Sequence, residues 1–292
     1  MNLLLPALVS GLTVGLLYGL FGLVVAVLYR ATGLVNFAVG GLATASVFAV
    51  WELQGPRGWS LPAAVVCGAL VASALGATSY VGTMTLRDRA GVGNRIMRTL
   101  ALLMLLQAIV QDRWGQGQPF ALKLTFLPGD IDLGVARIPG ASVAAVVLAL
   151  IVVAGGALIF EKTSIGLQLR AVADNRDAAT LVGIRTRLVT GVAWAGASVV
   201  AFLAGLLAAP DLLVSTYMFD GLMLFAFTAV VCAGLTSLGG SLLIGVVVGV
   251  VSTVAAVYLG PEFAVIAVFA TLLGALLLRP QGLFGRVVQE RL

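Results

Sequence analysis

The first 29 residues of the chain carry no charged side chain, and uncharged runs of similar length recur to its end. A helix needs about 20 apolar residues to cross about 30 Å of hydrocarbon. Only 10% of the 292 residues are charged and 61% are hydrophobic, whereas an ordinary soluble domain is about a quarter charged. A soluble globule is excluded, because its surface would be one continuous apolar patch. The sequence predicts an all-α polytopic membrane protein.

Clusters of charge divide the chain into apolar stretches. They cover 3–29, 34–51, 61–86, 100–110, 138–160, 188–210, 221–261 and 263–278. Stretch 221–261 is too long for one helix and has a Ser-Leu-Gly-Gly-Ser turn near its middle, which predicts two helices. Stretch 100–110 is too short to span alone and is interpreted as tilted, interrupted or re-entrant. We expect eight to ten transmembrane or re-entrant helices in one domain, 1–292.

The distribution of charge predicts the orientation. Arg30 and the clusters 87–98, 161–187 and 279–291 together hold 13 Lys/Arg and 5 Asp/Glu, and the remaining loops hold 4 and 7. The excess of Lys/Arg assigns the first group to the cytoplasm. With nine crossings, the N-terminus lies outside and the C-terminus inside. The first segment lacks a basic n-region, so it is predicted to be a retained span rather than a cleaved signal.

Several chemistries are disfavoured by what the sequence lacks. It contains no histidine, the commonest general base and metal ligand. Cys67 and Cys232 lie in apolar runs and are interpreted as inert thiols, so no metal site and no catalytic residue is predicted. A phosphate-binding Gly-x-x-x-x-Gly-Lys-Ser/Thr loop is also missing, so we expect no cofactor in this chain. An intramembrane enzyme is disfavoured further because every charged residue lies at a segment end or in a loop.

Glycine recurs at spacings that favour close helix packing. The sequence contains Gly11-x-x-x-Gly15-x-x-x-Gly19 and Gly245-x-x-x-Gly249 among its 36 glycines. Small residues four apart let helix backbones approach each other, since association in lipid rests on packing. This pattern predicts a tight, glycine-rich bundle.

Two glycine-rich segments, 33–41 and 234–241, combine glycine with polar residues and could open backbone groups to a cavity. Broken helices at corresponding positions of two halves point to a translocation site. The alternative, a plain loop and a tight turn, stays open. The candidate pathway residues are Asn36, Phe37, Gly40, Gly41, Thr236, Ser237, Gly239 and Gly240.

The loop 161–187 predicts two short helices. The first covers 166–173, and Asp174 or Asn175 caps a second over 176–182, which Gly183 ends. An alanine-rich face would fit a groove on a soluble partner; it comprises Ala171, Ala173, Ala178 and Ala179. The alternative is a solvated loop with incidental helicity.

Three stretches carry a family resemblance. They are 32–41 with Val-Asn-Phe-Ala, 166–184 with Leu-Arg-Ala-Val-Ala-Asp-Asn, and 278–285 with Leu-Arg-Pro-Gln-Gly-Leu-Phe-Gly. Together they resemble the shorter of the two paired inner-membrane permeases of ABC importers for branched-chain amino acids. The resemblance implies an importer permease fold, a second permease, cytoplasmic ATP-binding subunits and an external solute-binding protein. It also implies that 161–187 couples to the ATPase, through Gly166, Arg170, Ala171, Asp174, Asn175, Ala178, Ala179 and Gly183.

One departure from the family pattern bears on the substrate. Where the family usually has histidine after Asn-Phe-Ala, this chain has Val39, followed by Gly40 and Gly41. We therefore expect branched-chain or other small aliphatic amino acids, with urea or short amides as an alternative within the same family. A stand-alone facilitator or secondary carrier is the alternative outside it.

Overall fold

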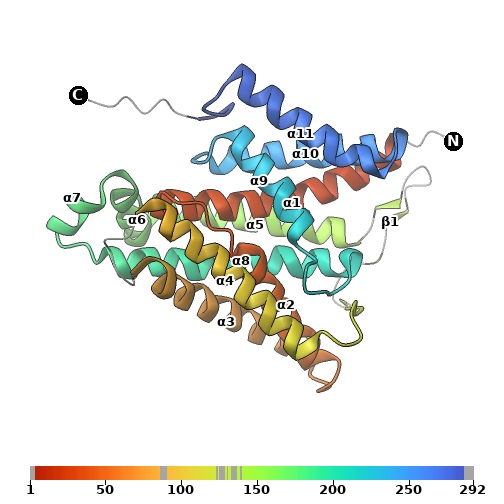
Figure 1. Cartoon of the computed structure of the whole chain (residues 1–292), viewed down its shortest axis with the longest axis horizontal. Coiled ribbons are helices and arrows are strands. Elements are labelled where there is room, and N and C mark those ends of the chain that lie inside the picture. The colour runs from red at the N-terminus through yellow and green to blue at the C-terminus, as the bar shows by residue number, and fades with distance from the viewer. Residues whose placement is uncertain are drawn as a thin grey trace. The chain divides into compact units, whose positions relative to one another are not determined.

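The computed structural model describes residues 4–85, 91–122 and 140–285, together with 124, 129, 131–132 and 137–138. Arg87, Lys123 and residues 286–292, which enter the predicted charge balance, lie outside the described residues. The α-helices are α1 Leu4–Thr32, α2 Val39–Gln54, α3 Leu61–Tyr80, α4 Val92–Trp114, α5 Gly140–Lys162, α6 Ser164–Asp174, α7 Arg176–Leu181, α8 Thr186–Leu212, α9 Asp220–Ala233, α10 Leu238–Tyr258 and α11 Pro261–Leu278 (Figure 1). A π-helical turn, η1, covers Val81–Thr85.

The predicted all-α membrane fold is confirmed. Within the described residues, six helices are long and apolar enough to cross a membrane: α1, α3 extended through η1, α4, α8, α10 and α11. The stretch 221–261 forms the two predicted helices, α9 and α10, but the turn between them covers 234–237, and most of the predicted Ser-Leu-Gly-Gly-Ser turn forms the first turn of α10. A two-residue antiparallel ladder, β1 Ile131–Asp132 with β2 Arg137–Ile138, is the one strand pair in the described part of the chain.

Of the alternatives predicted for 100–110, the interrupted helix is wrong. The helix α4 runs for 23 residues without a break and includes Arg95 and Arg98 near its start and Asp112 and Arg113 near its end. Charged side chains at both ends of a span can reach the membrane interface along their own length. The charges therefore mark the ends of the hydrocarbon segment, not the ends of the helix.

The chain divides into two compact units. Unit 1 comprises Met1–Ala26, Leu127–Ala149 and Gly221–Leu292, and unit 2 comprises Val27–Phe126 and Leu150–Asp220. Both α1 and α5 contribute residues to each unit. The two predicted pathway segments thus fall in different units.

In unit 1, the two predicted glycine motifs pack against each other. A Cβ added to Gly15 would lie 2.7 Å from Val246 Cα on α10, and one added to Gly11 would lie 2.8 Å from Val250 Cα. On the α10 side, Gly245 and Gly249 face the backbones of Gly19 and Gly15. These separations leave no room for a side chain, so the predicted close approach of helix backbones is confirmed.

In unit 2, α3 packs against α2 and α8, and α2 also contacts α4 and α8 (Figure 1). The largest buried side chains come from these helices and include Trp194, Phe48 and Phe202. Glycine again sets the approach, since a Cβ on Gly68 of α3 would lie 2.7 Å from Phe202 Cζ. The core of this unit therefore joins α2, α3 and α8.

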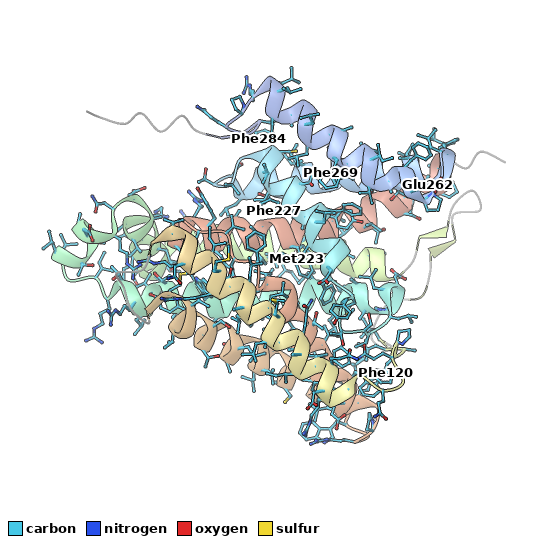
Figure 2. All side chains as sticks on the ribbon, in the orientation of Figure 1. Phe120, Met223, Phe227, Glu262, Phe269 and Phe284 are labelled. Atoms are coloured by element: carbon cyan, nitrogen blue, oxygen red, sulfur yellow. The ribbon has the colours of Figure 1, made fainter. Side chains whose placement is uncertain are left out.

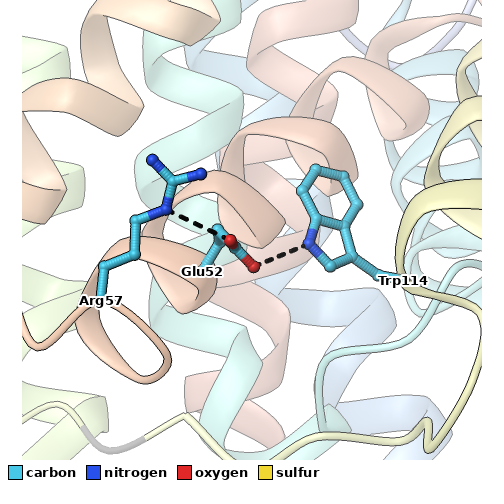
Figure 3. Close-up of polar contacts among 3 residues, drawn as sticks. All are labelled: Glu52, Arg57 and Trp114. Carbon is cyan, nitrogen blue, oxygen red and sulfur yellow. Dashed lines mark hydrogen bonds and ion pairs between the residues drawn. The ribbon is translucent and has the colours of Figure 1, made fainter.

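One end of unit 2 is tied by polar and aromatic contacts. Glu52 accepts hydrogen bonds from Trp114 Nε1 at 3.0 Å and from Arg57 Nε at 3.3 Å (Figure 3). The ring of Phe120, labelled in Figure 2, stacks on Trp51 with centroids 3.9 Å apart. These contacts fix the loop after α4 over the end of α2.

The glycine contact in unit 1 generates a stability prediction. Replacing Gly15 with alanine should lower the thermal stability of the detergent-purified protein, because the new methyl group meets backbone that has to shift. The matched control is Gly274→Ala on α11, where the added Cβ has nothing within 4 Å. There alanine should be neutral or stabilising by up to about 1 kcal/mol. The measurement is the fraction of monodisperse protein after heating, and equal behaviour of both variants would contradict the packing account.

The orientation generates a labelling prediction. Gln118 is a poor probe position, because its side chain bonds Trp114 and Thr216, whereas Gln116 is exposed. Cysteines at Gln116 and at Ala178, in a chain lacking Cys67 and Cys232, should react with an impermeant thiol reagent from opposite sides of the membrane. Labelling of both from one side would overturn the assignment.

Candidate functional site

The first predicted pathway segment is a true break in helical structure. Helix α1 ends at Thr32, Gly33 adopts a φ of +69°, and α2 begins only at Val39. Asn36 stabilises the turn between them, because its Oδ1 accepts a hydrogen bond from the Ala38 N–H at 2.9 Å. The predicted break between two helices is therefore present in the structure, and it lies within unit 2.

The same asparagine presents a free hydrogen-bond donor. Asn36 is only 1% exposed, yet its Nδ2 has no partner among the described residues. A buried donor without a partner costs about 1–3 kcal/mol, so such groups are rare without a reason. Nearby, the Phe37 N–H donates to Thr99 Oγ1 of α4 at 3.4 Å. The segment therefore combines non-helical backbone with a side-chain N–H donor, Asn36 Nδ2, that has no partner in the described part of the chain.

Glycines 40 and 41 lie inside α2 rather than in the break. Both are buried, and a Cβ on Gly41 would lie 3.0 Å from Leu103 Cδ1 on α4. Gly41 thus allows α2 and α4 to pack closely. Val39, the departure from the family pattern, is the first residue of α2 and is also buried.

The second predicted segment is a tight turn in unit 1. Gly234 ends α9 with a φ of +96°, and Ser237 caps α10 by accepting a hydrogen bond from the Gly240 N–H at 3.2 Å. Thr236 and Gly239 are exposed. Asn36 belongs to unit 2 and this turn to unit 1.

The segment after α11 packs against that turn, a contact the sequence did not predict. The N–H groups of Leu283 and Phe284 donate to the carbonyls of Cys232 and Ala233 at 2.8 and 2.9 Å, which satisfies free acceptors at the end of α9. A Cβ on Gly240 would lie 2.8 Å from the ring of Phe284, labelled in Figure 2. The second pathway segment, 234–241, and the family stretch 278–285 thus meet in space.

The loop after α5 forms the two predicted helices. Thr163 caps α6 by accepting from the Gly166 N–H at 3.1 Å. Asn175, not Asp174, caps α7, because its Oδ1 accepts from the Ala178 N–H at 2.9 Å. At the other end, Gly183 has a φ of +86° and its N–H bonds the Thr180 carbonyl, while Ile184 N–H bonds Ala179. This is a Schellman stop, so the predicted role of Gly183 is confirmed.

The predicted alanine face is divided between two sides of these helices. Ala179 is 3% exposed and packs in a cluster with Leu169, Val172, Val189 and Ala31, against which Ala171 also lies. Ala173 and Ala178 are exposed. The alanines therefore do not form one face, because helices this short must bury one side on α8.

The outward side of the α6–α7 pair carries large apolar residues. Leu181 is 89% exposed and Val182 is 76% exposed, both at the end of α7. Leu167 of α6 is exposed as well, and Arg170 of the same helix is half-buried. We call the surface formed by Ala178, Leu181 and Val182 the α7 tip. An exposed apolar surface on a rigid, capped helix is typical of an interaction site.

Unit 2 also has an open surface depression along α4. Its volume is about 470 Å³, and it is lined by Met104, Gln107, Ala108, Gln111, Asp112 and Tyr217. Gln107 donates a hydrogen bond to Asp220, which lies 113 residues away in the sequence, so no local pattern could reveal the pair. Among the described residues, no group of His, Cys, Asp or Glu could hold a metal ion.

Comparisons with known proteins match nearly the whole chain. Residues 7–278 match the family described as branched-chain amino acid transport system, permease component. The high-affinity branched-chain amino acid transport system permease protein BraD of Pseudomonas aeruginosa is 28% identical, over 98% of this chain and 97% of its own. The corresponding Escherichia coli protein LivH is 25% identical, over 97% and 96%.

A further relative matches part of the chain, and one solved structure has a similar fold. The Escherichia coli autoinducer 2 import system permease protein LsrC is 32% identical over 66% of this chain and 54% of its own. A chain from the structure of PsaBC from Streptococcus pneumoniae in complex with Fab superposes with a TM-score of 0.51 at 14% identity, covering 96% and 93% of the two chains. With the family match spanning almost all of its helices, this chain belongs to the branched-chain amino acid transport system permease components.

Proposed function

We propose that this chain is the membrane-spanning permease subunit of an ATP-driven importer for branched-chain or other small aliphatic amino acids. The observation that carries the proposal is the family match over residues 7–278, with relatives such as BraD aligned over nearly their full length. The substrate is taken from the names of these relatives. The chain is a multi-pass membrane protein, and we assign it to the inner membrane.

The proposal divides the work among several polypeptides. This chain would form the pathway with a second permease, cytoplasmic ATP-binding subunits would hydrolyse ATP, and an external solute-binding protein would deliver the amino acid. The sequence has no phosphate-binding loop of its own. We therefore propose that this chain is not an enzyme and needs no cofactor.

The α7 tip would dock in a groove on the ATP-binding subunit. Support comes from its rigidity, since α7 is capped at both ends, and from the exposure of Leu181 and Val182. The inner side of α6 and α7 packs on α8 through Val189 and Ala193. A displacement of the docked helix would therefore be transmitted to α8, a membrane-spanning helix of unit 2.

We assign Asn36, in the break after α1, and Gly239, in the first turn of α10, to the solute pathway, each within its own unit. Asn36 Nδ2 is a donor without a partner, and Gly239 has open space where a side chain would stand. A weakly polar pathway of amides, hydroxyls and backbone suits a zwitterion that must bind briefly and leave. Gly240 takes no direct part in this proposal, because it packs against Phe284.

Co-purification tests the class of transporter. When the tagged chain is purified in mild detergent from the membranes of its own host, we expect a second permease and ATP-binding subunits to purify with it as one complex. A stand-alone facilitator has no use for the exposed α7 tip and would purify without an ATPase. Persistent failure to recover any ATPase would favour that alternative.

The buried and exposed alanines of α7 provide a matched pair of variants. Ala178→Glu places a carboxylate at the third position after the Asn175 cap, where acidic residues favour the helix, so folding should be preserved. It should nevertheless uncouple ATP hydrolysis from uptake, because charge and volume enter the docking surface. Ala179→Glu should instead lose several kcal/mol of stability, because it buries a charge. Thermal stability, ATPase rate and uptake measured in parallel separate the two effects, and normal coupled uptake in the Ala178 variant would exclude the docking role.

Substitutions at the breaks test the pathway. Asn36→Leu and Gly239→Val should depress uptake more than Ser73→Leu and Thr253→Val, which alter half-buried positions within α3 and α10. Gly239→Val meets no neighbouring atom within 4 Å at its Cβ, so its effect should not come from a clash. Uptake is compared at equal protein level and equal ATPase binding. Equal losses at all four positions would indicate general packing damage.

A further inference from the structure

The depression on α4 is built from one helical stripe and one loop residue. Met104, Gln107, Ala108, Gln111 and Asp112 follow the spacing i, i+3, i+4, i+7 and i+8, which places them on a single face of the helix. Tyr217, from the segment after α8, closes another side. The depression is open to the surface and has a volume of about 470 Å³.

This face of α4 is unlike a surface made for lipid. The exposed large side chains of α11 are aromatic or branched aliphatic, such as Phe269, labelled in Figure 2, Ile266 and Leu273. The α4 stripe instead combines unbranched Met104, which is 70% exposed, with two amides and a carboxylate. Amides and carboxylates are costly against hydrocarbon and suit a surface that meets water or a solute.

The polar groups around the depression are held in place by neighbours from other segments. Gln107 Nε2 donates to Asp220 Oδ1 at 3.0 Å, and Thr216 Oγ1 donates to Gln111 Oε1 at 2.9 Å. Gln107 Nε2 also approaches Asp220 Oδ2 at 3.4 Å, so both oxygens of that carboxylate face the Gln107 amide, whereas the Gln111 amide nitrogen remains available. The site is therefore pre-organised before any ligand arrives.

The charge of the site is negative. Asp112 lines the depression and makes no ion pair with any described residue, and Asp220 is joined to it through Gln107. The lining contains no Lys or Arg. The nearest basic residue in sequence, Arg113, is turned by roughly 100° around the helix from Asp112. An ammonium group fits this arrangement, whereas a free carboxylate would be repelled.

From this geometry we infer that the depression is a subsite for the ammonium end of a small aliphatic amino acid entering the permease. Asp112 accepts a hydrogen bond from the ammonium group, Asp220 adds negative charge from behind Gln107, and Met104, Ala108 and Tyr217 contact the aliphatic chain. This inference rests on the proposed function for the identity of the solute. It adds a selective element, because the subsite favours solutes with an ammonium group over aliphatic acids.

Protection of an introduced thiol tests the subsite. The full-length chain with Ala108→Cys, lacking Cys67 and Cys232, is placed in lipid nanodiscs and labelled with N-ethylmaleimide. L-Leucine and 3-methylbutylamine should slow the labelling in a saturable manner, and 4-methylpentanoate, which lacks the ammonium group, should not. Ala101→Cys is the matched control, since Ala101 is exposed on the same helix two turns away and outside the depression.

Carboxylate variants test the assigned chemistry. Asp112→Asn should raise the concentration of 3-methylbutylamine needed for half-protection by roughly tenfold, and Asp220→Asn should raise it by less, because Asp220 acts through Gln107. Asp211→Asn, an exposed carboxylate outside the lining, should leave it unchanged. Absent protection, or equal protection by the amine and the acid, would overturn the subsite.

The two proposals fail in different ways. If the complete importer takes up leucine but no amine protects the thiol, the subsite is wrong and the transport function stands. If the amine protects in a saturable manner but the complete importer does not take up branched-chain amino acids, the ammonium subsite stands and the proposed substrate is wrong.

Discussion

Close approach of helix backbones at glycine is the contact on which both units depend. Lipid gives helices no hydrophobic reason to associate, so the bundle is held by packing and by interhelical hydrogen bonds. In unit 1 the glycines of α1 and α10 face each other's backbones. In unit 2, a Cβ on Gly76 of α3 would lie 2.7 Å from the backbone oxygen of Trp194 on α8. These contacts form a scaffold rigid enough to hold polar groups at membrane depth.

On this scaffold, the interruptions of helical structure are stabilised by side-chain caps. Asn36 closes the turn after α1, Ser237 caps α10, and Thr163 and Asn175 cap the two short helices after α5. Each cap satisfies backbone donors that would otherwise be left without partners. The segments that carry the family resemblance thus include the places where long helices end. In these places the caps hold the candidate functional residues in position.

The local part of this structure could be predicted from the sequence, because charge clusters, glycine spacing and cap residues act over a few residues. Asn175 and Gly183 were found in this way. Contacts between distant segments could not be predicted. The burial of Ala179 but not Ala178 depends on which side of α7 meets α8, and the contact of Phe284 with the α9–α10 turn joins segments about 40 residues apart. The length of α4 was missed because charge was equated with the end of the helix.

The central claim is that this chain conducts branched-chain amino acids in an importer driven by ATP. The most direct measurement is the uptake of radiolabelled L-leucine by proteoliposomes that contain the complete complex, with the binding protein outside and ATP inside. The account predicts accumulation against the gradient that requires ATP and this chain, and little uptake of urea or acetamide. Uptake that is independent of ATP, or accumulation of urea in place of leucine, would contradict it.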